Sequence, residues 1–174
     1  MKQMATANNP DLNFADKPVQ VDVQVAEEIS DAPAESDIQW WLEQVVAQLE
    51  SDTTRQVEVS VKIVDEVEGR ELNKRFRDAA GATNVLSFPL LDAAMPADLP
   101  LALGDIVICG PVVAREATEQ GKSNSDHWAH MLVHGALHLF GYDHETDEQA
   151  QEMETLEARI LALGGVENPY ECRD

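Results

Sequence analysis

The sequence predicts an α+β fold in which about five helices cover a small four-stranded mixed sheet. Short stretches alternate between apolar and polar residues with a period of two, which is typical of half-buried strands. Longer stretches with helical periodicity lie between some of them. Three helical stretches follow one another at the end of the chain, so the order is not a strict repeat of strand and helix. A mixed order of this kind favours the α+β class.

The first half of the chain predicts two strands, each followed by a helix. Valines alternate with polar residues over 19–25, and valine and isoleucine alternate in the same way over 57–63. A loop around Pro33 precedes a helix that we expect over 36–49. A second helix is expected over 66–76.

The second half of the chain predicts two further strands and three helices. The apolar segment 84–88 is closed by Pro89 and predicts the third strand. Residues 90–100 are expected to form a loop before a fourth strand over 105–109. Three helices then complete the chain, over 111–120, 125–140 and 147–163.

The histidines are the most informative residues, and all five lie between His127 and His144. Residues four apart share one face of an α-helix, so the imidazoles of His134 and His138 can converge on one ion. Gly141 can adopt the left-handed conformation that ends a helix and returns His144 toward the pair. Three histidines without a fourth protein ligand leave an open position on tetrahedral zinc, which is the catalytic arrangement. The sequence predicts one Zn2+ per chain, bound by His134, His138 and His144.

The histidines also allow interpretations other than metal binding. A histidine on an apolar helix is often a hydrogen-bonded core residue, but three at this spacing with a glycine turn favour metal ligands. His127 and His130 precede His134 by seven and four residues, so their side chains can face the site. Because three ligands complete a catalytic set, we expect these two to support the ligands or to lie at the surface.

The spacing of the run 134–144 matches the HExxHxxGxxH pattern of zinc proteases, with one difference. Gly135 stands where those enzymes carry the glutamate that deprotonates water. Zinc lowers the pKa of bound water toward ~7 without that base, so a metal-dependent hydrolase remains the prediction while peptide cleavage loses support. Asp143 is a candidate to orient an imidazole or to assist proton transfer, and it can equally cap the backbone of the turn.

Composition limits the domain organisation and the cellular location. The 174 residues and 44% hydrophobic content suffice for one core, so we expect a flexible tail over 1–17 and a single domain over 18–174. A net charge of −21 argues against indiscriminate binding of polyanions. Cys109 and Cys172 do not form a disulfide framework, which fits a cytoplasmic setting. Neither a signal peptide nor a stretch of ~20 apolar residues is present, so no membrane partner is expected.

Three separated motifs precede the histidine run and carry a family resemblance over about 19–165. They are LNKRFR at 72–77, TNVLSFP at 83–89 and LGDIVI at 103–108. With the histidines, they resemble the YbeY family of bacterial metal-dependent endoribonucleases, which are rRNA maturation factors.

The resemblance implies a cytoplasmic enzyme that cleaves single-stranded RNA in the processing and quality control of ribosomal RNA, especially at the 3′ end of 16S rRNA. It implies zinc on His134, His138 and His144, and a functional arginine at Arg77. The implied partners are single-stranded RNA, ribosomal RNA and the ribosome or its small subunit, and no DNA is expected.

Arg70, Lys74, Arg75 and Arg77 place four of the twelve basic residues in one short stretch. A local basic face on an acidic protein can attract phosphate while the remaining surface repels nonspecific RNA, which favours substrates presented by a partner such as the ribosome. The guanidinium of Arg77 can also bind phosphoryl oxygens bidentately. Alternatively, these are ordinary solvated helix charges.

The chain departs from the family pattern at residues 78–82. Members of the family commonly carry a turn of the Gly-Lys-Asp-x-Pro type there, and this chain lacks that turn and its basic residue.

Two functions of other classes remain open. A ribosome-assembly factor with a structural zinc would unfold when the metal is removed and would not cut RNA. A zinc peptidase or amidase that takes its base from elsewhere, such as Glu145, would cleave peptides but not single-stranded RNA.

Overall fold

The computed structural model describes residues 19–49, 56–90 and 99–171, and the tail expected over 1–17 lies outside them. The described residues confirm the α+β class, with four strands and five helices. In chain order the elements are β1 (Val19–Val25), α1 (Glu35–Gln48), β2 (Val57–Val64), α2 (Glu66–Arg77), β3 (Val85–Pro89), β4 (Leu101–Cys109), α3 (Gly110–Glu119), α4 (Asn124–Leu139) and α5 (Asp147–Leu163).

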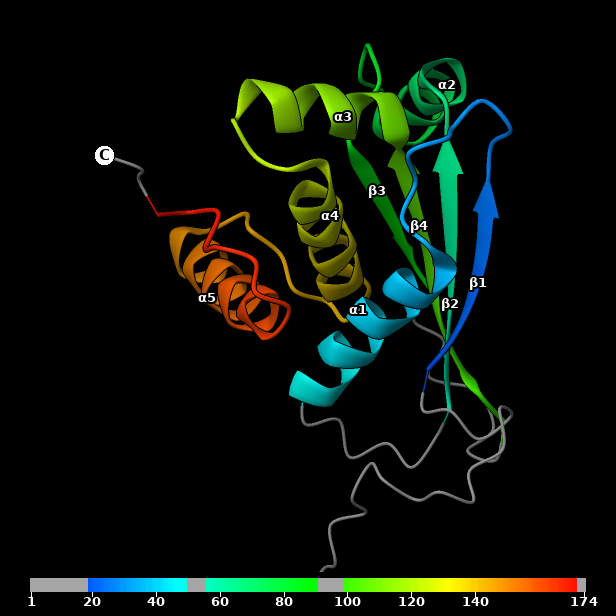
Figure 1. Cartoon of the computed structure of the whole chain (residues 1–174). Helices are drawn as coiled ribbons and strands as arrows, with labels where there is room; N and C mark the ends of the chain where they lie inside the picture. The colour runs from blue at the N-terminus through cyan, green and yellow to red at the C-terminus, as the bar shows by residue number, and fades with distance from the viewer. Residues whose placement is uncertain (1–18, 50–55, 91–98, 172–174) are drawn as a thin grey trace, which may run out of the picture.

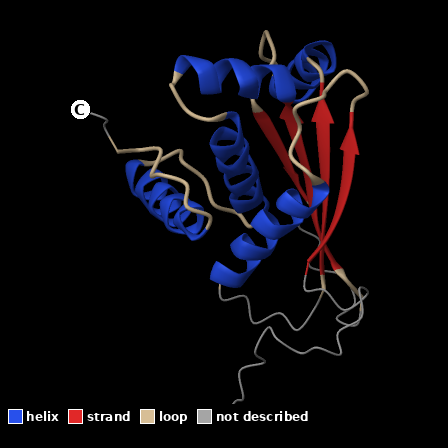
Figure 2. Ribbon diagram, viewed as in Figure 1, coloured by secondary structure: helices blue, strands red, loops and turns tan. Residues whose placement is uncertain are grey.

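The four strands form one mixed sheet in the order β1-β2-β4-β3. β1 and β4 both run parallel to β2, whereas β3 pairs antiparallel with β4. The alternation in β2 has a direct cause, since Val59 and Val61 are buried while Glu58 and Lys62 are exposed. Figure 2 shows the strands as one layer with most of the helices to one side of it.

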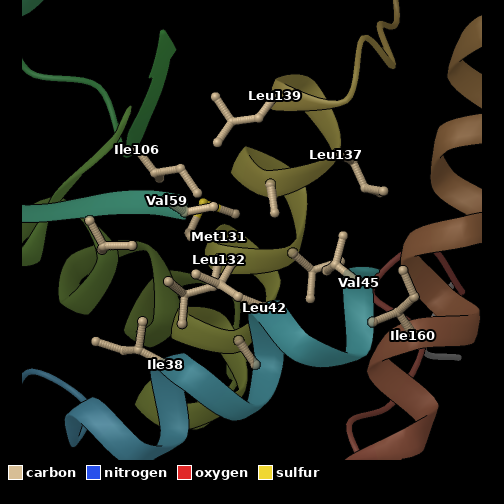
Figure 3. Close-up of a cluster of buried hydrophobic side chains, with 14 of the residues drawn as sticks. Ile38, Leu42, Val45, Val59, Ile106, Met131, Leu132, Leu137, Leu139 and Ile160 are labelled. Carbon is tan, nitrogen blue, oxygen red and sulfur yellow. The ribbon is translucent and has the colours of Figure 1, made fainter. Parts of the chain in front are cut away.

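Helices α1 and α4 cover one face of the sheet, and α5 packs against α4 on the side away from the strands (Figure 1). The main core lies between these layers and includes Leu42 of α1, Ile106 of β4, Leu132 and Leu137 of α4 and Ile160 of α5 (Figure 3). Helix α4 is therefore enclosed by apolar side chains on most sides, which fixes the position of the histidines it carries.

A smaller apolar cluster, with Val64, Leu86 and Val107 at its centre, packs against Leu72 of α2. Neighbouring residues of β4 point to opposite faces of the sheet, so Ile106 joins the main core while Val107 joins this second cluster. The second cluster holds α2, and with it the basic stretch, against the sheet on the face opposite to the main core.

The predicted element bounds agree with the structure to within one or two residues, except at β4. This strand begins at Leu101 rather than at residue 105, because Leu101 and Ala102 pair with Val57 and Glu58 of β2. The stretch is apolar, but Pro100 and Gly104 on either side of it weaken the strand pattern, so the pairing with β2 makes it a strand. Most of the loop expected over 90–100 lies outside the described residues. No helix in the described part of the chain is long and apolar enough to cross a lipid bilayer.

Candidate active site at the histidine helix

The turn after α4 brings three histidines together. Helix α4 begins at an N-cap, where the Ser123 hydroxyl accepts from the backbone N–H of Asp126. It ends before Gly141, whose φ of 92° lies in the left-handed region, as the sequence predicts. The backbone N–H of Gly141 donates to the carbonyl of His138 at 3.0 Å. The chain therefore reverses within one turn and returns His144 to the helix face.

The ligand atoms of His134, His138 and His144 all lie within 4.8 Å of one another. The Nε2 atoms of His134 and His138 are 3.1 Å apart, and the rings of His138 and His144 have centroids 5.2 Å apart. Burial lowers the pKa of His138, and the nearby His134 and His144 lower it further. A neutral imidazole is the form that binds a metal, so this cluster is suited to hold one ion.

A cavity of about 660 Å³ opens beside these histidines. Arg77, the last residue of α2, lies in its wall together with side chains of β3 such as Ser87. The guanidinium of Arg77 therefore shares one cavity with the three imidazoles, although Arg77 is distant from them in the sequence. Its lining residues are Asn73, Arg77, Thr83, Asn84, Val85, Leu86, Ser87, Pro89, His134, His138, Gly141, Tyr142, Asp143, His144 and Glu145.

Gly135 is a point of close approach between α4 and the sheet. The Ser87 hydroxyl donates to its carbonyl at 2.9 Å. A Cβ atom at this position would lie 2.9 Å from Cγ2 of Ile106 and 3.1 Å from Cγ2 of Val85. Packed side chains of the sheet occupy this position, which leaves no room for the glutamate of a zinc protease.

Two acidic side chains of the turn also lie in the cavity wall. The Oδ1 atom of Asp143 accepts from the backbone N–H of His144 at 2.8 Å, so the carboxylate caps the turn that carries the third histidine. Glu145 is exposed and lines the same cavity.

The other basic residues of α2 lie away from the cavity. Arg70, Lys74 and Arg75 are exposed, and the cavity lining in the described structure includes none of them. The guanidinium of Arg75 lies 5.2 Å from the centre of the Phe76 ring. Of the four basic residues of the stretch, the described structure brings only Arg77 to the histidines.

Behind the histidines lies a buried carboxylate that the sequence analysis did not single out. Glu157 of α5 is 0% exposed, and its Oε1 accepts from Nδ1 of His134 at 2.5 Å. Its Oε2 accepts from the Tyr170 hydroxyl and lies 3.3 Å from Nε2 of His130. Burial alone raises the pKa of Glu157, but the hydrogen bonds from His130, His134 and Tyr170 outweigh it and lower the pKa to about 2. The sequence does carry a sign of this carboxylate. Glu157 is a charged residue within the apolar stripe of α5, next to Leu156 and three residues before Ile160.

His127 supports a different part of the site. It is 2% exposed, and its Nε2 lies 2.7 Å from Oε2 of Glu116. The same Glu116 carboxylate accepts from the side-chain amide of Asn84, which lies in the cavity wall immediately before β3. His127 and His130 therefore both support residues of the site, one through Glu116 and the other through Glu157.

An α+β scaffold that brings three imidazoles and an arginine into one cavity is the arrangement of a metal-dependent hydrolase. The profile of the family described as Endoribonuclease YbeY matches residues 20–164 of the chain. The chain belongs to this family, as the four motifs of the sequence indicated.

Proteins named Endoribonuclease YbeY are similar over most of the chain. The protein from Halorhodospira halophila is 54% identical over 143 residues, which are 82% of this chain and 90% of the relative. The protein from Pseudomonas syringae pv. syringae is 51% identical over 152 residues, which are 87% of this chain and 88% of the relative. The fold also resembles the solution structure of a Thermotoga maritima protein, which is 23% identical with a TM-score of 0.53 over 88% of this chain and 97% of that chain.

Proposed function

We propose that the protein is a cytoplasmic, single-strand-specific metallo-endoribonuclease that hydrolyses RNA phosphodiesters. We further propose that it acts in ribosomal RNA processing, including maturation of the 3′ end of 16S rRNA, and in ribosome quality control. Family membership supports the reaction class. The observation that carries the mechanism is the position of Arg77 in the wall of the cavity beside the three histidines.

The donor atoms of the cluster fit zinc. Three imidazole nitrogens within 4.8 Å of one another match the ligand set of a catalytic zinc site, and no cysteine among the described residues joins the group. Zinc bound there would supply Lewis acidity and would acidify water for attack on phosphorus. The open cavity beside the ligands favours a catalytic site over the closed, structural zinc of an assembly factor.

The protein side chains supply charge and position. Arg77 is exposed at the end of α2, so its guanidinium can bind two oxygens of one phosphate and oppose the charge that develops on them. Asp143 caps the turn that carries His144, and it lies close enough to the cavity to exchange a proton with water or with the leaving oxygen. Arg70, Lys74 and Arg75 extend the positive charge along α2 beyond the cavity, where they can attract the RNA backbone.

The overall charge supports a substrate that is presented by a partner. A protein with a net charge of −21 repels free RNA except at a local basic face. We therefore propose that ribosomal RNA reaches the cavity while it is held on the small ribosomal subunit. A peptidase is the weaker alternative, because the crowded position of Gly135 excludes the usual glutamate base.

The test compares the wild type with His138→Ala, Arg77→Ala and Arg159→Ala on single-stranded ribosomal RNA, with bound metal quantified in each preparation. Arg159 is an exposed arginine of α5 that lies outside the lining of the site cavity and serves as the matched control. His138→Ala should lose both metal and cleavage. Arg77→Ala should keep the metal and lose cleavage by roughly 100-fold or more, as expected when a charge-stabilising donor is removed. Arg159→Ala should behave as the wild type.

Two results would contradict the proposal. Equal cleavage by wild type and Arg77→Ala would remove the arginine from the mechanism. Metal binding without RNA cleavage by clean wild-type protein, combined with unfolding when the metal is removed, would favour the assembly factor with a structural zinc.

A further inference from the structure

The buried face of the histidine cluster rests on one carboxylate. Glu157 projects from α5 between Leu156 and Ile160, and it has no exposed surface. A charged group in such a place is stable only when donors satisfy it. Three donors do so here, namely His134, Tyr170 and His130, and they come from α4 and from the C-terminal segment after α5.

The contact with His134 decides which nitrogen of that ring faces the cavity. A neutral imidazole carries its proton on one nitrogen and a lone pair on the other. With the carboxylate 2.5 Å from Nδ1, the proton lies on Nδ1 and the lone pair on Nε2. This Nε2 is the atom that lies 3.1 Å from Nε2 of His138.

The carboxylate itself is held from the opposite side. The Tyr170 hydroxyl donates to Oε2 of Glu157, and Nε2 of His130 lies 3.1 Å from the same hydroxyl. Tyr170 lies beyond the residues 20–164 that match the family profile. A residue of the C-terminal segment thus reaches the metal centre through Glu157.

The same atoms also offer a second set of metal-binding groups, formed by His130, His134 and Glu157. Hydrogen bonds already account for their contacts, and the set would use Nδ1 of His134, which faces Glu157. These contacts favour a support for the ligands over a second ion.

We propose that Glu157 is a positioning residue that holds His134 as its Nδ1–H tautomer with Nε2 directed at the metal, and that Tyr170 holds Glu157 in this orientation. This role rests on the proposed three-histidine site. Hydrogen-bonded partners of metal-binding histidines typically change metal affinity 10–100-fold when they are removed.

The experiment uses the full chain as wild type, Glu157→Gln, Tyr170→Phe and Glu152→Gln. Glu152 is an exposed glutamate on the same helix and provides the matched control. Zinc affinity is measured by competition with a chromophoric chelator, and the metal content is counted. Long-range proton–nitrogen correlation spectra of the metal-free proteins report the tautomer of His134, and thermal unfolding identifies the variants that fold.

Glu157→Gln should weaken zinc binding by about 10–100-fold and shift His134 away from the Nδ1–H tautomer. Tyr170→Phe should give a smaller loss in the same direction, and Glu152→Gln should give none. If Glu157→Gln does not fold, Tyr170→Phe decides the outcome, because it removes one hydroxyl from a half-exposed side chain.

Unchanged affinity and an unchanged His134 tautomer in the folded variants would overturn the proposal. So would two zinc ions per wild-type chain with one lost in Glu157→Gln, since Glu157 would then be a ligand. The His138→Ala variant distinguishes failure of the three-histidine site from failure of the Glu157 role. If His138→Ala binds zinc as the wild type does, the three-histidine site is wrong. If His138→Ala loses zinc while Glu157→Gln and Tyr170→Phe keep it, the site stands and only the role of Glu157 is contradicted.

Discussion

Gly135 shows how one residue separates this site from a zinc protease of the same histidine spacing. Its Cβ position is occupied by Ile106 and Val85. Overpacking of a core contact costs about 1–3 kcal/mol, and the gain in helix propensity from glycine to alanine returns about 1 kcal/mol. We expect Gly135→Ala to lower the free energy of unfolding by about 1 kcal/mol, and Gly135→Glu to lower it further without producing peptidase activity.

Denaturant unfolding of the three proteins, together with a peptide-cleavage assay, measures both effects. An increase in stability for Gly135→Ala by the amount expected at an open helix position would show that the contact is not tight. Peptide cleavage by Gly135→Glu would show that the side chain reaches the cavity.

His127 predicts a pH dependence of stability. Burial lowers its pKa in the folded protein, and the hydrogen bond to Glu116 offsets this only in part. The unfolded chain therefore takes up a proton more readily, so this part of the stability is present above the ordinary histidine pKa of about 6.5 and is lost as the pH falls below it. The His127→Gln variant should lose less stability on acidification than the wild type. Urea unfolding at neutral and at mildly acidic pH measures the difference, and equal losses would contradict it.

At the scale of elements, the turn after α4 sets the position of the third histidine. Gly141 has a φ of 92°, and Gly121 has a φ of 63° at the equivalent position after α3. Alanine at either glycine should destabilise the protein by about 1 kcal/mol, because a left-handed conformation strains a side chain. Only Gly141→Ala should also weaken zinc binding, since only this turn carries His144. If both variants bind zinc with equal affinity, the turn at Gly141 does not determine how His144 is positioned for zinc binding.

The sequence was sufficient to predict the elements with strong local patterns. The valine alternation of 19–25 and the histidine helix needed no tertiary information. The first residues of β4 were missed because their strand conformation depends on pairing with β2. Glu157 and Tyr170 were missed for a related reason, since their contacts with His134 depend on how α5 and the C-terminal segment pack against α4. The sheet order and the position of Arg77 in the cavity wall likewise depend on tertiary packing.

At the scale of the whole molecule, the charge distribution limits how RNA binds. The net charge is −21, and four basic residues of α2 form the local exception. The affinity for single-stranded RNA falls with salt in proportion to the phosphates that are neutralised. Four contacts give a slope of log affinity against log salt no steeper than about −3. Binding titrations across a salt series should find this shallow slope, and Arg75→Ala should make it shallower. A much steeper slope would reveal a larger basic surface than α2 provides.

The three histidines of the cluster come from one short stretch of chain, His134 to His144. Their proximity in sequence persists when the protein unfolds, so the denatured chain retains a weak chelator. A ligand stabilises a fold only by the difference between its affinities for the folded and the unfolded chain. Zinc therefore protects this protein against unfolding by less than its affinity for the native site implies. The advantage of the native state comes from what a flexible peptide lacks, which is the packing of α5 and the C-terminal segment behind the ligands.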